Sequence, residues 1–130
     1  MTTPVRIQRR RTKGWRAPEG AVYVGRGTRW GNPWAVTLDR TRGWRVHPAA
    51  ERSPLSEHIV GWYLDRTRAA GVAVRRYRDH LDQHPEIVES ARRELAGKSL
   101  ICWCPTPEAS YDPDHCHAAV LLDLANRPAA

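Results

Sequence analysis

The 130-residue sequence contains no phenylalanine, one methionine and only three cysteines. The cysteines are an odd number within fifteen residues, which argues against the paired framework of a small secreted domain. The longest apolar stretch, about Ala118 to Leu124, is much shorter than the ~18 residues that a membrane span requires. The start, MTTPVRIQ, has no apolar segment of the kind found in signal peptides. We therefore expect a cytoplasmic protein without a membrane partner.

The composition is that of one globular domain, because 41% of the residues are hydrophobic and 27% are charged. The sequence contains six tryptophans but no phenylalanine. The indole N–H needs a partner or water, so we expect several of these side chains to be half-exposed. No internal repeat is visible, and we expect residues 1–130 to form a single domain with one modest core.

The net charge of +7 lies entirely in the first thirty residues. This segment holds eight basic side chains and the single acid Glu19, whereas the remaining hundred residues hold thirteen of each sign. The asymmetry predicts that residues 1–20, an extended or irregular basic arm, meet something anionic. We expect a nucleotide or a nucleic acid as the partner, and the pattern defines no protein partner.

Four short segments rich in apolar residues predict strands. They cover residues 21–25, 34–38, 44–46 and 99–103. The first of them, AVYVG, combines β-branched and aromatic residues and ends at a glycine, which is typical of a buried strand.

Four helices are predicted from apolar residues at helical spacing. The first begins at Ser53, followed by proline at the first helical position, and ends at Gly71. The second follows Gly71, and the last two cover residues 85–97 and 118–125. We expect an α/β fold, in which a short sheet of three to four strands packs with three to four helices in a single small domain.

Three cysteines and a histidine near the carboxyl end form a candidate set of metal ligands. Cys102 and Cys104 end the last predicted strand, and Cys116 and His117 begin the last helix. Three thiolates and one imidazole suffice for tetrahedral zinc, so zinc is the cofactor that we expect. The spacing is awkward, because residues two apart on a strand lie ~7 Å apart, whereas two thiolates on one zinc lie within ~4 Å.

Two other interpretations of this cluster stay open. Cys102 is also typical of an inert strand residue, since free cysteine is among the most buried residue types. Alternatively, Cys104 or Cys116 pairs with His117 as a nucleophile and its base, and these three residues are then catalytic. His115 is an alternative metal ligand.

A glycine-rich loop follows the first predicted strand and runs from Gly25 to Pro33. Glycines let backbone N–H groups approach an anion, and arginines bind phosphate through two parallel hydrogen bonds. The loop lacks the G-K-[ST] element of a Walker loop, and a tight turn packed under Trp30 and Trp34 explains it equally well. In the arm, cations accompany Trp15, which offers a stacking face. The predicted ligand-binding residues are Arg9, Arg11, Lys13, Arg16, Arg26, Arg29 and Asn32.

Four segments of the chain resemble the Domain of Unknown Function 4326 family of small bacterial and phage proteins. They are RIQRRRTKGWR, VYVGRGTRWGNPW, ELAGKSLICWCP and CHAAVLLDLAN, and the resemblance covers about residues 6–38 and 72–126. Residues 47–71 are longer than the corresponding family segment, which indicates an insertion, and the loop after Cys104 is also longer. His115 lies outside the family pattern. The resemblance implies no activity.

We hypothesise that the arm, the glycine-rich loop and the Cys/His cluster converge on one pocket that holds a phosphate-bearing ligand. An enzyme acting on nucleotides or bases is one hypothesis for such a pocket, although no acidic catalytic pair stands out in the sequence. The alternatives are a zinc-stabilised nucleic-acid-binding module without catalysis, and an interaction module whose arm docks on an acidic protein. Sequence-specific readout is not expected, because no recognition helix is evident.

Overall fold

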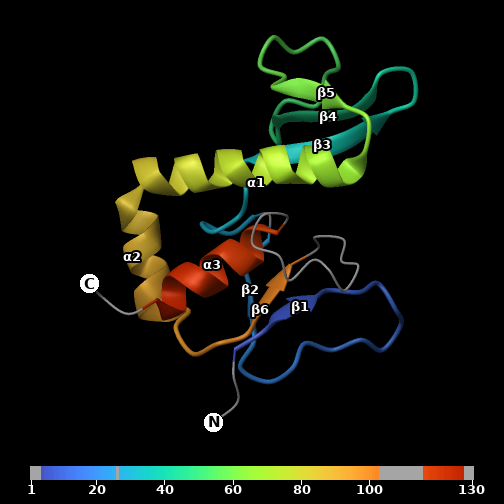
Figure 1. Ribbon diagram of the computed structural model, residues 1–130. Coiled ribbons are helices and arrows are strands. Elements are labelled where there is room, and N and C mark those ends of the chain that lie inside the picture. Colours follow the sequence, from blue (N-terminus) through green and yellow to red (C-terminus); the bar gives the residue numbers. More distant parts are fainter. Residues whose placement is uncertain (1–3, 26, 103–115, 128–130) are drawn as a thin grey trace.

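The computed structural model describes residues 4–25, 27–102 and 116–127. Within these residues the chain has an α/β fold with two small sheets and three helices (Figure 1). The parallel sheet has the strand order β1-β6-β2, and the antiparallel sheet has the order β3-β4-β5. The strands are β1 (Arg6–Gln8), β2 (Val22–Tyr23), β3 (Trp34–Asp39), β4 (Gly43–Pro48), β5 (Gly61–Tyr63) and β6 (Leu100–Cys102).

The helices are α1 (Arg66–Gln83), α2 (Pro85–Glu94) and α3 (His117–Asn126). The long α1 lies between the antiparallel sheet and the half of the molecule that contains the parallel sheet, and α2 turns away from its end to pack beside α3 (Figure 1). No helix within the described ranges is long and apolar enough to cross a lipid bilayer.

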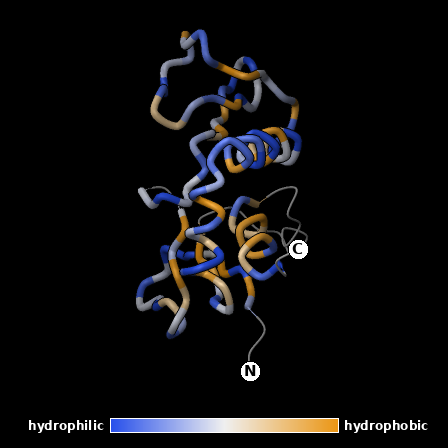
Figure 2. The backbone as a smooth tube through the Cα atoms, turned by 90° about the vertical axis from the view of Figure 1, so that its left-hand side faces the viewer, coloured by the Kyte–Doolittle hydropathy of each residue, from blue (hydrophilic) through white to orange (hydrophobic). Residues whose placement is uncertain are grey.

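Two apolar cores hold the fold together. The larger one lies among the parallel sheet and the three helices, in the half of the molecule where hydrophobic residues gather (Figure 2). Its largest fully buried side chains are Val24, Tyr77, Leu95, Leu100 and Leu121.

The smaller core lies between α1 and the antiparallel sheet. It joins Val46 of β4 to Ala69 and Ala73 of α1, and partly buried aromatic side chains surround it. Because Val74 and Tyr77 of the same helix belong to the larger core, α1 contributes one face to each core.

The predicted α/β fold class is confirmed. The four predicted strands coincide with β2, β3, β4 and β6, and the last two predicted helices coincide with α2 and α3. The sheet, however, is divided into two sheets of three strands. Within the described residues, the strands β3, β4 and β5 form hydrogen bonds with one another, and α1 packs on their apolar face. These three strands are therefore stabilised without pairing to the parallel sheet.

The predicted helix from Ser53 to Gly71 is wrong. Its middle forms β5, where Trp62 pairs with Arg45 of β4. Aromatic residues favour strands, and here a tertiary partner strand outweighs the helical spacing of the apolar residues.

The helix that does form, α1, begins twelve positions later than the Ser-Pro signal suggests. Asp65 caps it, because its carboxylate accepts a 2.8 Å hydrogen bond from the backbone N–H of Arg68. The helix then continues through Gly71, and the second predicted helix is its continuation. Packing against both cores compensates for the low helix propensity of that glycine.

Residues 6–8 of the predicted basic arm form β1 rather than irregular chain. The backbone of Val5 accepts a hydrogen bond from Leu100, and Arg9 donates one to Cys102, so β1 continues the ladder of β6 at both ends. Arg6 is buried as a result, with only 3% of its surface exposed. No alternation of apolar residues predicts this strand. Its extended conformation is stabilised by the hydrogen bonds to the buried strand β6.

Candidate functional site at the carboxyl edge of the parallel sheet

Three segments that are distant in the sequence meet where the parallel strands end. At this carboxyl edge the N–H of Arg9, just after β1, donates to the carbonyl of Cys102 at 2.8 Å. The N–H of Val24, just after β2, donates to the carbonyl of Ile101 at 2.9 Å. Helix α3 also begins at this edge. In α/β folds, ligands bind outside the carboxyl ends of the parallel strands, so this edge is the candidate site.

Two thiols lie side by side at this edge. The Sγ atoms of Cys102, the last residue of β6, and Cys116, the N-cap of α3, are 3.6 Å apart, and both residues are fully buried. The Arg6 Nε donates to the Cys102 Sγ at 3.3 Å. The guanidinium of Arg6 and the amino end of α3 therefore place positive charge beside the two thiols.

The imidazole of His117 joins α3 to the glycine-rich loop. Its Nε2 lies 2.9 Å from the carbonyl oxygen of Val24, and its ring meets the ring of Tyr77 edge-on at a centroid distance of 5.4 Å. The Tyr77 hydroxyl in turn donates to the carbonyl of Trp30 at 2.6 Å. His117 and Tyr77 therefore fix both ends of the segment that connects β2 with Trp30.

Arg9 and Tyr23, which follow or end the two outer strands of the parallel sheet, contact each other. The Arg9 guanidinium lies 5.5 Å from the centroid of the Tyr23 ring. The phenol of Tyr23 folds back over Gly25 so closely that a Cβ at that position would come within 2.3 Å of the hydroxyl oxygen. A side chain at position 25 would therefore displace the Tyr23 ring, on which the Arg9 guanidinium is stacked.

The other predicted ligand-binding residues divide into three groups. Arg11, Lys13 and Arg16 are exposed in the connection between β1 and β2. Arg26 lies outside the described residues, as does Cys104 of the predicted metal and catalytic set.

Arg29 and Asn32 form the third group, whose side chains are held by the protein itself. Arg29 pairs with Glu94 of α2 at 3.2 Å and donates to the Ser90 hydroxyl at 3.1 Å. The Asn32 amide donates to the carbonyl of Ala73 and accepts from the backbone of Trp34. Both residues thus shape the glycine-rich loop.

Of the four predicted zinc ligands, the structure brings Cys102 and Cys116 together. Two thiolates bound tetrahedrally at ~2.3 Å would lie about 3.8 Å apart, close to the observed 3.6 Å. His117 directs its Nε2 to the carbonyl of Val24. In the part of the chain that the structure describes, no group of three or more metal-binding side chains is found.

Sequence reasoning missed Arg6 as a member of the site. Arg6 is one of eight cations in the first thirty residues, and its sequence position indicated only the extended or irregular basic arm. Only the pairing of β1 with β6 shows that this one cation is buried against a thiol.

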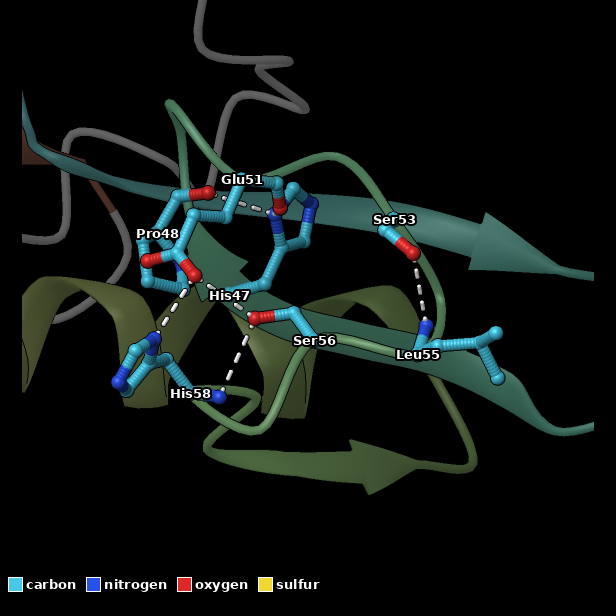
Figure 3. Close-up of polar contacts among 7 residues, drawn as sticks. All are labelled: His47, Pro48, Glu51, Ser53, Leu55, Ser56 and His58. Carbon is cyan, nitrogen blue, oxygen red and sulfur yellow. Dashed lines mark hydrogen bonds and ion pairs between the residues drawn. The ribbon is translucent and has the colours of Figure 1, made fainter.

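A second polar cluster lies far from this edge, in the loop between β4 and β5 that falls within the predicted insertion (Figure 3). Glu51 accepts hydrogen bonds from Ser56 at 3.0 Å and from His58 at 2.7 Å, beside a surface hollow of about 470 Å³. The hydrogen bond with His58 lowers the pKa of Glu51 and raises the pKa of His58. The side chains of His58 and Glu51 are 59% and 42% exposed, as in an ordinary surface ion pair.

The comparisons with known proteins identify the family of the chain but no activity, substrate or ligand. No curated protein and no solved structure matches the chain significantly. The model of one family, the domain of unknown function DUF4326, matches residues 7–127, which is nearly the whole chain. The chain therefore belongs to the DUF4326 family.

Proposed function

We propose that the protein binds a phosphate-bearing ligand, in the simplest case a nucleotide, at the carboxyl edge of the parallel sheet. One observation supports this above all: the basic connection after β1, the loop after β2 and the start of α3 meet there. The hydrogen bonds from Arg9 to Cys102 and between His117 and Val24 join them. The amino end of α3 adds its partial positive charge to that of the arginines.

The cations of the site come from the connection between β1 and β2. Arg9, Arg11, Lys13 and Arg16 are exposed and follow the strand that ends at the site. Arg26 stays in the proposed set. Arg29 and Asn32 act indirectly, because they hold the loop in place through α2 and α1.

Titration calorimetry with ATP and with inorganic phosphate tests this proposal. Replacing Arg9 and Arg11 with alanine should weaken ATP binding by at least about tenfold, since a charge-assisted hydrogen bond contributes roughly 1.5–3 kcal/mol. The matched control replaces Arg92 and Arg93 of α2, which removes the same charge and should change the affinity less than about twofold. Equal losses in both variants, or no ATP binding by the wild type, would refute a site at this edge.

The enzymatic part of the proposal rests on Cys104, Cys116 and His117. A thiolate at Cys116 lies at a helix N-terminus, where nucleophilic cysteines are activated. The reaction class is cleavage at a glycosidic or phosphoester bond of the bound nucleotide. Incubation with each ribonucleoside triphosphate should release base or phosphate, and Cys116→Ser should abolish the release while the circular dichroism spectrum stays unchanged. Release that survives both Cys104→Ser and Cys116→Ser would rule out thiol catalysis.

A structural zinc ion is the second candidate, and the 3.6 Å separation of the two Sγ atoms favours it. Cys102 and Cys116 would hold the ion, with Cys104 and His117 as the further ligands. Elemental analysis of protein purified without chelators should then find about one zinc per chain. Cys102→Ser should lose the metal, and His117→Gln shows whether the imidazole is a ligand. Less than half an equivalent in the wild type would exclude zinc.

A further inference from the structure

Two arginines of α1 lie over tryptophan rings of the antiparallel sheet. The guanidinium of Arg66 is 5.4 Å from the Trp44 ring centroid, and that of Arg76 is 5.2 Å from the Trp34 ring centroid. Within the described residues, neither Arg66 nor Arg76 forms an ion pair with a carboxylate. Both arginines are exposed to solvent.

Arg68 of the same helix differs from these two arginines, because it pairs with the carboxylate of Asp65 at 3.3 Å. A cation over an indole in water is held only weakly, and its hydrogen-bonding edge stays available. The tryptophans therefore orient the two guanidinium groups without neutralising them.

The two pairs lie on the same side of the antiparallel sheet. Trp34 and Trp44 both pack against the small core of Val46, Ala69 and Ala73, so their rings lie on the side of the antiparallel sheet that α1 covers. The arginines are ten residues apart on α1, which places them about 15 Å apart along the helix axis. We call the surface formed by these four side chains the Arg–Trp face.

Two further observations describe the surroundings of this face. Leu38 is directly opposite Trp44 in the β3–β4 ladder and is 50% exposed, so apolar surface adjoins the cationic side chains. From Trp34 to Gln83 the chain has nine arginines against six acidic residues, so the face lies in a positively charged part of the molecule.

We propose that the Arg–Trp face binds single-stranded nucleic acid. Such a strand offers phosphates to the guanidinium edges and bases that stack on the outer guanidinium planes, on half-exposed indoles and on Leu38. Two stacked arginines about 15 Å apart suit a polymer better than a mononucleotide, which reaches only one of them. The surface uses other residues than the carboxyl edge, so each proposal can fail without the other.

Fluorescence anisotropy of a labelled oligothymidylate of about twelve nucleotides, long enough for one binding site, tests this proposal. Replacing Arg66 and Arg76 with alanine should weaken binding by about 10- to 100-fold and flatten the log–log salt slope by about 1.4. The matched control replaces Arg68 and Arg93, which removes the same charge and should change the affinity less than about threefold.

A second variant covers the case in which the alanine protein does not fold. Lysine at positions 66 and 76 keeps the charge but loses the planar stacking group, so it should lose affinity while retaining most of the salt slope. ATP binding should be unaffected in both variants, because the carboxyl edge is intact.

Three outcomes would overturn the proposal. The first is no binding of the oligonucleotide at 50 mM salt by the wild-type protein. The second is an equal loss of affinity in the Arg68/Arg93 control, which would show that binding depends on net charge alone. The third is equal binding of heparin, a polyanion without bases, with full retention in the lysine variant; the face would then suit an acidic partner of any kind.

Discussion

The parallel and the antiparallel sheet are of similar size, but they are stabilised differently. In the parallel sheet the central strand β6 is buried along its whole length and contacts the large side chains of the main core. In the antiparallel sheet, β3 and β5 are half-exposed over most of their length, and the apolar core there is built on the three small or branched side chains of Val46, Ala69 and Ala73.

The central strand β4 of the antiparallel sheet also buries the polar side chains of Arg45 and His47, whereas the central strand β6 of the parallel sheet consists of buried apolar residues. On the face away from α1, Arg45 donates to the carbonyl of Arg52, and His47 contacts the carbonyl of Glu51 (Figure 3). The loop between β4 and β5 thus covers this face through hydrogen bonds to its backbone. One half of the molecule depends on apolar burial between distant segments, and the other on local polar contacts and stacked arginines.

The largest expected effect comes from the central strand. Leu100→Ala removes a fully buried side chain and should lower the free energy of unfolding by about 2–5 kcal/mol. Leu38→Ala, at a half-exposed position of the other sheet, should change it by less than about 0.5 kcal/mol. Urea denaturation followed by tryptophan fluorescence measures both. Equal effects would show that the two sheets are stabilised in the same way.

The next effect concerns the contact between α1 and the glycine-rich loop. Tyr77→Phe leaves the carbonyl of Trp30 without its buried donor, which should cost about 1–2 kcal/mol of unfolding free energy. Tyr63→Phe, in the antiparallel sheet, is the matched control and should cost less. If urea titration finds no loss in Tyr77→Phe, water replaces the hydroxyl and the loop is not held by this bond.

A smaller effect separates the true start of α1 from the start that the Ser-Pro signal suggests. Asp65→Ala removes the N-cap hydrogen bond to Arg68 and should lower the unfolding free energy by about 1 kcal/mol. Ser53→Ala should change it by less than about 0.5 kcal/mol, because that hydroxyl serves only a turn. The reverse order of the two losses would place the helix start at the serine after all.

The smallest effect is the pH dependence of the Glu51–His58 pair. The pKa of His58 is raised, so its contribution is present below its usual 6.5 and disappears as the pH rises through the folded value. The pKa of Glu51 is lowered, so its contribution is present above 4.5 and disappears as the pH falls through the folded value. Glu51→Gln should therefore lower the melting temperature more at pH 5.5 than at pH 8.5. A difference that does not depend on pH would show that only the hydrogen bond matters.

The helices and strands that were predicted correctly are those with a proline, a glycine or an apolar pattern in their own residues. The proline at position 85 opens α2, the apolar residues before Cys102 form β6, and the apolar run after His117 forms α3. The failures have tertiary causes. β1 has no strand pattern of its own, and its partner residues are 94 positions away, as for Arg6 and Leu100.

The candidate site, like the secondary structure, was predicted only in part from the sequence. The residue types indicated that Cys102 and Cys116 come together, and they do. The partner of His117 is a backbone carbonyl, which any residue at position 24 would supply, so no residue type could indicate it. Likewise, the paired carboxylate that engages Arg29 lies on α2, and only the packing of that helix reveals it.

The sharing of α1 between both cores has a consequence for cooperativity. A helix with one side embedded in each half cannot unwind in one half while it persists in the other. Melting of either half therefore releases the second, so heating should produce a single calorimetric transition. By the same linkage, any molecule that binds only the native state will raise the transition temperature of the entire chain, wherever on the surface it attaches.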